Sequence, residues 1–166
     1  MKKALAITPA GLAILLSGCV LLPSAPVVTA PVGPNPLAPG IGSAQGRLEV
    51  YSRLSARSDD QNQDSTDPVW NQRTDYYLSN ARDSNWRQVY NAAGHYSDAP
   101  RTISLPAGQY LVEAQAAPGN WVRVPVTIQS GRVTRVHLDS HWAPPGFAGQ
   151  DQIVRLPHGQ AIGWRL

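Results

Sequence analysis

Hydrophobic and polar residues alternate most regularly between residues 105 and 139. From residue 121 to residue 128 every second position is Val or Ile, and the positions between them carry an aromatic, a basic residue, a proline and a threonine. This period of two is typical of a β-strand with one buried face. Ser130-Gly131 and Pro106-Ala107-Gly108 supply turn residues. The stretch therefore predicts three strands joined by tight turns, with a hairpin at Ser130-Gly131.

Shorter alternating runs occur on both sides of this stretch, and turn residues separate them. No run shows apolar residues at the 3.6-residue spacing of a helix over three turns. We therefore expect an all-β protein, a single antiparallel β-sandwich of about seven strands with a C-terminal β-hairpin extension. The additional predicted strands are 47–54, 74–80, 86–91 and 101–105, and those of the hairpin are 152–156 and 160–165.

Residues 1–18 have the features of a signal peptide. Two lysines precede an apolar run that ends at Leu16 and is too short to span a bilayer as a helix. The sequence Leu16-Ser17-Gly18-Cys19 resembles the lipobox of bacterial lipoproteins. The resemblance implies that signal peptidase II recognises Leu16, Ser17 and Gly18, and that Cys19 receives the lipid. The alternative is an ordinary secretory leader that happens to contain a cysteine.

Cys19 and the residue after it bear on the cellular location of the protein and on the thiol chemistry open to it. Cys19 is the only cysteine, so a lipidated Cys19 leaves no disulfide and no thiol nucleophile. Two or three acyl chains anchor a protein stably. Val20 follows Cys19, whereas an Asp there is associated with retention in the inner membrane. The resemblance therefore implies a protein of the cell envelope anchored by lipid, with the outer membrane favoured.

The chain divides into four parts by composition. After the leader, residues 19–45 contain the lipidated Cys and a segment with six prolines and no charged residue. Such a segment is typical of a semi-rigid spacer, with a full reach of about 80 Å. Residues 46–139 form the predicted sandwich. Residues 140–166 form a loop and a hairpin that we expect to pack on an edge of the sandwich.

The charge of the chain argues against a nucleic-acid partner. Without Lys2 and Lys3, which lie in the predicted leader, the 14 basic residues fall to 12 against 11 acidic ones. No basic stripe remains, so we expect no nucleic-acid binding. We expect a membrane contact through the lipid on Cys19, an envelope protein as partner, and a glycan as the other candidate ligand.

Residues 105–116 and 121–139 resemble the second half of transthyretin-like or carboxypeptidase-regulatory-like sandwiches, including PEGA-type domains. The shared features are a Pro-x-Gly-x-Tyr turn and strand, followed by a hairpin. The resemblance implies a fold used for structural support and binding, often as an accessory module, and it brings no catalytic residue. Related surface domains form Lys-Asn isopeptide bonds, but the mature chain has no lysine.

Candidate catalytic and metal-binding residues are few. His137 and His141 resemble a ligand pair, but exposed histidines at a strand end are the favoured interpretation. Glu49 and Glu113 face outward on predicted strands, where a carboxylate pair would suit glycoside hydrolysis and pairing with arginine is the simpler alternative. There is no GxSxG elbow. We expect no metal, no cofactor and no enzymatic activity.

Aromatic residues are the remaining candidates for binding. Outward-facing rings on a flat sheet can stack on sugars or on a protein partner. The favoured alternative is a second, minor core, in which the tail residues Trp142, Phe147 and Trp164 cover that face. The candidate ligand-binding aromatics are Tyr51, Tyr76 and Trp121.

These observations predict a lipid-anchored envelope protein with a binding or structural function and no catalysis. The first alternative is a lipoprotein that binds carbohydrate or peptidoglycan through an aromatic face. The second is an envelope hydrolase whose site the sequence does not reveal.

Overall fold

The computed structural model describes residue 28 and residues 30–57, 70–81, 85–94 and 97–166. Strands dominate these ranges, which confirms the predicted all-β class. No helix in the described part is long and apolar enough to cross a membrane. The elements are β1 (Gly46–Tyr51), β2 (Leu54–Arg57), β3 (Trp70–Arg73), β4 (Tyr76–Asn80), β5 (Trp86–Val89), β6 (Ile103–Leu105), β7 (Gly108–Gln115), β8 (Trp121–Ile128), β9 (Val133–His137), the 3-10 turn η1 (Gln150–Gln152), β10 (Ile153–Arg155) and β11 (Ala161–Trp164).

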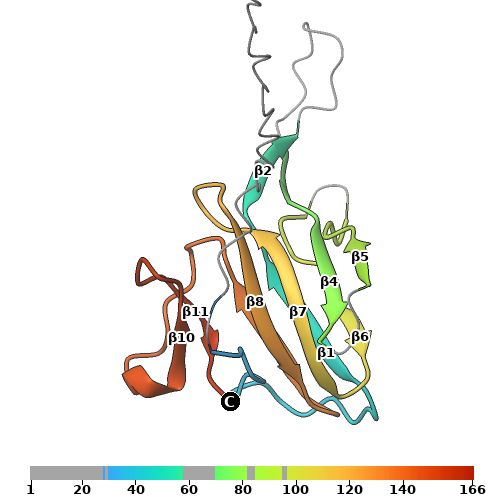
Figure 1. Ribbon diagram of the computed structural model, residues 1–166, viewed down its shortest axis with the longest axis vertical. Coiled ribbons are helices and arrows are strands. Elements are labelled where there is room, and N and C mark those ends of the chain that lie inside the picture. The colour runs from blue at the N-terminus through green and yellow to red at the C-terminus, as the bar shows by residue number, and fades with distance from the viewer. Residues whose placement is uncertain (1–27, 29, 58–69, 82–84, 95–96) are drawn as a thin grey trace, which may run out of the picture.

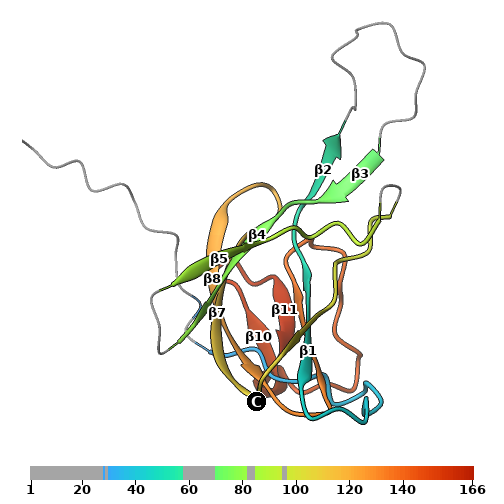
Figure 2. The ribbon, with the colours of Figure 1, turned by 90° about the vertical axis from the view of Figure 1, so that its right-hand side faces the viewer.

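Two sheets face each other to form a sandwich (Figures 1 and 2). One has four strands in the order β5-β4-β7-β8, and the other has three in the order β6-β1-β9. The described strands β2 and β3 form a separate ribbon, as do β10 and β11. Pairing within the two sheets is antiparallel except between β1 and β9, which run parallel.

The core lies between the two sheets and follows the alternation of the sequence. Alternate residues of β7 and β8 are buried, among them Val112 and Val124. Leu48, Val50 and Val136 meet them from the three-stranded sheet. Burying an aliphatic side chain of this size contributes about 1.5–3 kcal/mol. The sandwich is therefore held by two apolar faces that the period of two encodes.

The turn at Ser130-Gly131 joins two different sheets, so the hairpin predicted there is wrong. Gly131 does take the positive φ expected of it, 70°. However, β8 pairs only with β7 among the named strands, and β9 pairs with β1. The physical reason is competition for the free edge of β8, because another segment of the chain already occupies it.

That segment begins at residue 28, within the predicted spacer. The Val32 N–H donates to the Pro125 carbonyl and the Thr127 N–H donates to the Val32 carbonyl, both at 2.9 Å. The Gly33 N–H donates to the Trp164 carbonyl at 2.7 Å. Val28 and Val32 are buried in the main core. The described residues from 28 to 41 are therefore part of the fold and not a free spacer, because these valines supply both the backbone donors and the apolar side chains.

The same segment connects the sandwich to the C-terminal hairpin. Val32 forms isolated bridges with Val126 on one side and Arg165 on the other. A Cβ atom on Gly163 would lie 2.6 Å from a Val32 methyl and 2.9 Å from the Arg135 carbonyl oxygen. Only glycine permits this close approach. The described residues of this segment and the hairpin thus close the side of the sandwich formed by β8 and β9.

The hairpin β10–β11 is present as predicted and carries a small core of its own. Ile153, Ala161 and Trp164 are buried together, and Trp142 packs against them. Phe147 remains exposed, so the expectation that it joins this core is wrong. The minor core forms as expected around Trp142 and Trp164 without it.

Candidate functional site

The structure does not bring the three predicted binding aromatics together. Tyr76 is fully buried in the core, which corrects its assignment as a candidate for ligand binding. The reason is the phase of β4, where Tyr76 and Leu78 face inward and Tyr77 faces outward. Tyr51 and Trp121 belong to β1 and β8, so they lie on the outer faces of different sheets.

The outer face of the four-stranded sheet carries three exposed aromatic rings from three strands. Tyr77, Trp86 and Trp121 have 40%, 38% and 37% of their surface exposed. The ring centroids of Tyr77 and Trp121 lie 6.0 Å apart with the planes tilted by 38°. We call these rings together with Arg123 the outer aromatic face. Sequence reasoning missed Tyr77 and Trp86, although both occur in predicted strands.

Arg123 holds the outer aromatic face together. Tyr77, Glu113 and Arg123 form one row across β4, β7 and β8. The Arg123 Nε donates to a Glu113 carboxylate oxygen. The guanidinium carbon also lies 5.5 Å from the centre of the Trp86 ring, within range of a cation–π contact. The ion pair expected for Glu113 is confirmed, and it fixes a charged group among the exposed rings.

Tyr51 lies in a column of stacked side chains on the outer face of the other sheet. The Arg73 guanidinium carbon is 4.8 Å from the centre of the Tyr51 ring. The Tyr51 and His137 rings stack at 4.4 Å, and the His137 and Trp142 rings stack at 4.8 Å. The Tyr51 ring therefore packs against side chains of its own chain. This agrees with the alternative in which residues of the C-terminal tail cover the candidate aromatics.

Beside this column Arg73 and Asp139 form a buried ion pair. Their side chains approach to 2.9 Å, and each is 5% exposed. The Arg73 Nη1 also donates to the Ser52 carbonyl at 2.7 Å. His141, in contrast, is largely exposed, and its Nδ1 is 3.7 Å from Asp139. Asp139 thus neutralises Arg73, which ties the ribbon β2–β3 to the end of β9.

The predicted metal and hydrolase residues have other partners. His137 and His141 line an open hollow of about 370 Å³. No group of three or more metal-binding side chains occurs in the described ranges. Glu49 pairs with Arg135 at 2.8 Å on one sheet, and Glu113 pairs with Arg123 on the other. The two carboxylates therefore do not form the pair that glycoside hydrolysis needs.

His137 makes the stability of the fold depend on pH. Burial lowers the pKa of His137 to about 4, with Arg135 and Arg73 acting in the same direction and Asp139 and Glu49 opposing them. The folded state thus resists protonation, whereas the unfolded chain takes up the proton near pH 6.5. The free energy of unfolding should fall by about 2 kcal/mol between pH 7 and pH 4.5 through this residue.

Urea denaturation of the wild type and of His137→Gln at both pH values measures this contribution. The variant should lose less stability than the wild type on acidification, because its side chain does not titrate. Equal losses in the two proteins would show that His137 is protonated as readily in the fold as in the unfolded chain.

The lipobox residues Leu16, Ser17, Gly18 and Cys19 lie outside the described residues, as do residues 58–69 between β2 and β3. No protein-family model, curated protein or solved structure matches this chain.

Proposed function

We propose that this chain is a lipid-anchored envelope protein without catalytic function, whose sandwich binds a protein partner through the outer aromatic face. The observation that carries the proposal is the exposure of Tyr77, Trp86 and Trp121 around Arg123 on one sheet face. The lipobox-like sequence ending at Cys19 supports the anchor and the envelope location, with the outer membrane favoured.

The composition of this face favours a protein as the ligand. Tyr, Trp and Arg dominate the residues that contribute most to protein–protein binding. Sugars stack best on the open face of an aromatic ring, and here Arg123 lies over Trp86 while Tyr77 and Trp121 are tilted by 38°. The resemblance to transthyretin-like accessory modules points in the same direction. Glycan binding is therefore the second candidate.

Trp121→Ala should weaken binding of the partner about tenfold, because it removes one of the three exposed rings. The partner is first identified by crosslinking in cells and pull-down of the full chain. Its affinity for the purified wild type and variant is then measured by calorimetry. Phe147→Ala is the matched control, because Phe147 is exposed on the C-terminal tail, outside the outer aromatic face. It should leave the affinity unchanged.

Two other outcomes would overturn parts of the proposal. Recovery of peptidoglycan fragments in place of a protein, with loss of the fragments in Trp121→Ala, would establish the glycan alternative. Cys19→Ala should move the protein from the membrane to the soluble fraction of the cell. Retention of this variant in the membrane would refute the lipid anchor and leave the binding face untouched.

A further inference from the structure

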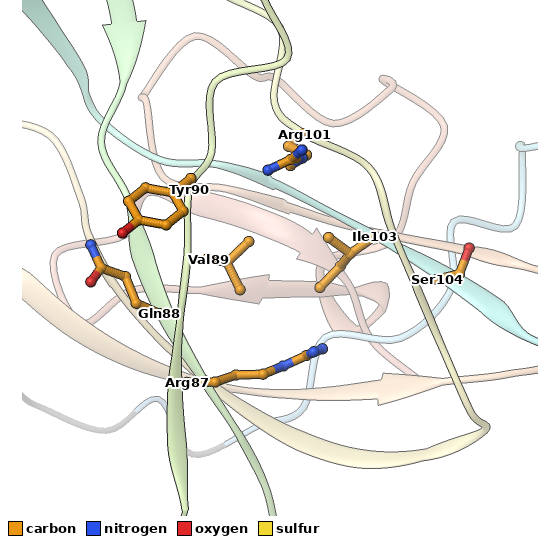
Figure 3. Close-up of a pocket in the computed structure, with 7 residues that line it drawn as sticks. All are labelled: Arg87, Gln88, Val89, Tyr90, Arg101, Ile103 and Ser104. Carbon is orange, nitrogen blue, oxygen red and sulfur yellow. The ribbon is translucent and has the colours of Figure 1, made fainter.

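A groove runs along the side of the sandwich opposite the N-terminal segment. It lies between β5 and β6, the outermost strands of the two sheets, and has a volume of about 380 Å³. Figure 3 shows Val89 and Ile103 facing each other across it, with Arg87 and Arg101 toward its two ends. The groove therefore combines an apolar floor with two cationic groups.

The path of the chain shapes the groove. Beyond β5, Ala92 and Pro100 form an isolated bridge, and the Arg101 N–H donates to the Asn91 carbonyl at 2.9 Å. From there the two segments diverge toward β5 and β6 (Figure 3). In the described ranges, each of these strands pairs with a neighbour of its own sheet on one side only. Two strand edges thus border the opening.

Within the described ranges, the two arginines in the groove have no acidic partner. Arg73, Arg123 and Arg135 each pair with a carboxylate. Arg87 and Arg101 make no ion pair within the part of the chain that the structure describes, and no acidic residue lines the groove. Arg87 lies opposite the buried Leu78 in the β4–β5 pairing, so its side chain starts on the inner face of the sheet.

The hydroxyl of Tyr76 adds a buried polar group beside these arginines. It is buried and has no hydrogen-bond partner within the described ranges. Burial raises the pKa of Tyr76 above its ordinary value, and Arg87 and Arg101 oppose this shift. Both guanidinium groups therefore act on the same hydroxyl, which makes this region of the molecule attractive to an anion.

The opposite side of the sandwich shows how an extended segment closes such an opening. There the segment around Val32 pairs with the free edge of β8 and buries its valines between the sheet and the hairpin. On the side of β5 and β6, no described segment forms a bridge to the free edge of either strand. An extended chain from a partner fits this side by the same combination of edge pairing and apolar burial.

We propose that the groove between β5 and β6 binds an extended acidic peptide segment of a partner protein. The peptide adds as a strand to the free edge of β5. Its carboxylates pair with Arg87 and Arg101, and an apolar side chain between them covers Val89 and Ile103. This site is separate from the outer aromatic face, so it stands whether or not that face binds a partner.

The probe is a fluorescein-labelled peptide of nine residues. Asp, Val, Asp, Val and Asp occupy the odd positions, and serine occupies the even ones, so that acidic and apolar side chains share one face of a strand. Binding to the full chain is measured by fluorescence anisotropy. We expect Arg87→Gln and Arg101→Gln to weaken binding about fivefold each and together about 20-fold. The affinity should also fall as salt is added.

Three controls separate strand addition from attraction by charge alone. Arg165→Gln removes an exposed arginine next to β11 and should bind the probe like the wild type. A probe with N-methyl groups on the serine residues keeps its charge but loses backbone donors, and it should bind much more weakly. A probe with lysine in place of aspartate should not bind.

Equal affinity of the wild type and the double variant would overturn the proposal, as would equal binding of the methylated and parent probes. Both arginines are exposed, so the variants should unfold at the temperature of the wild type. Trp121→Ala should bind the probe normally, which keeps this test independent of the outer aromatic face.

Discussion

Replacing Val32 by aspartate should lower the free energy of unfolding by about 4 kcal/mol, although Val32 lies in a segment with the composition of a spacer. The side chain is completely buried in the main core. Its backbone pairs with β8 on one side and with the residue after β11 on the other. An aspartate there would bury an unpaired charge and separate the hairpin from the sandwich.

Urea denaturation followed by tryptophan fluorescence measures this effect. Leu37→Asp is the matched control, because Leu37 belongs to the same proline-rich segment but is 56% exposed. It should change the free energy of unfolding by less than about 0.5 kcal/mol. A Val32→Asp protein as stable as the control would mean that the segment is a spacer after all.

Arg73→Met should destabilise the protein by about 3–5 kcal/mol, because it leaves the Asp139 carboxylate buried without its partner. The two side chains are 5% exposed, so water cannot replace the lost contact. The variant also loses the hydrogen bond to the Ser52 carbonyl and the contact with the Tyr51 ring. This single arginine thus connects β3, the bend after β1 and the end of β9.

A double-mutant cycle isolates the ion pair from these other contacts. Adding Asp139→Leu to Arg73→Met should recover part of the lost stability, since no uncompensated charge remains. Arg135→Met is the comparison at a pair that water reaches, with Glu49, and should cost at most about 1 kcal/mol. Additive losses in the cycle would show that Arg73 and Asp139 contribute independently.

The strands of this fold, apart from β2 and β3, could be predicted because most of them bury one face only. In β7 and β8 the buried residues are aliphatic apart from Tyr110, and the outward residues are polar, aromatic or proline apart from Leu111, so the period of two is visible in the sequence. The sandwich class follows from the same pattern, whereas β11 is buried at all four positions and does not show it. Local alternation thus predicts where these strands lie and which side of each strand is buried.

The pairing of the strands could not be predicted, because it depends on which segment occupies each edge. Val32 takes the edge of β8, and β9 therefore pairs with β1 in the other sheet. Six prolines argued against any pairing in the N-terminal segment. Isolated bridges need only a few donors, however, and Val28 and Val32 supply them.

The candidate sites depended on details that alternation does not resolve. Tyr76 and Tyr77 are adjacent and chemically alike, so the sequence does not show which of them faces outward. Arg87 occupies an inward position on the edge strand β5, and Arg101 lies two residues before the edge strand β6. A long side chain at such a position reaches solvent past its own backbone. In a pattern of alternating residues, a charged side chain is assigned to the outer face of the sheet. The groove between the two arginines could therefore not be predicted.

The Val28 N–H donates a hydrogen bond to the Arg123 carbonyl at 2.8 Å. This contact fixes Val28 on the sandwich and so limits the length of free chain between the domain and Cys19. Cys19 lies nine residues before Val28. With the lipid proposed on Cys19, the chain between them spans at most about 30 Å, against about 80 Å for a free spacer of residues 20–45. The domain would be confined to a thin layer beside the bilayer. The domain would then encounter proteins of the same membrane most often. Partners farther from the bilayer than the length of this chain would lie out of reach.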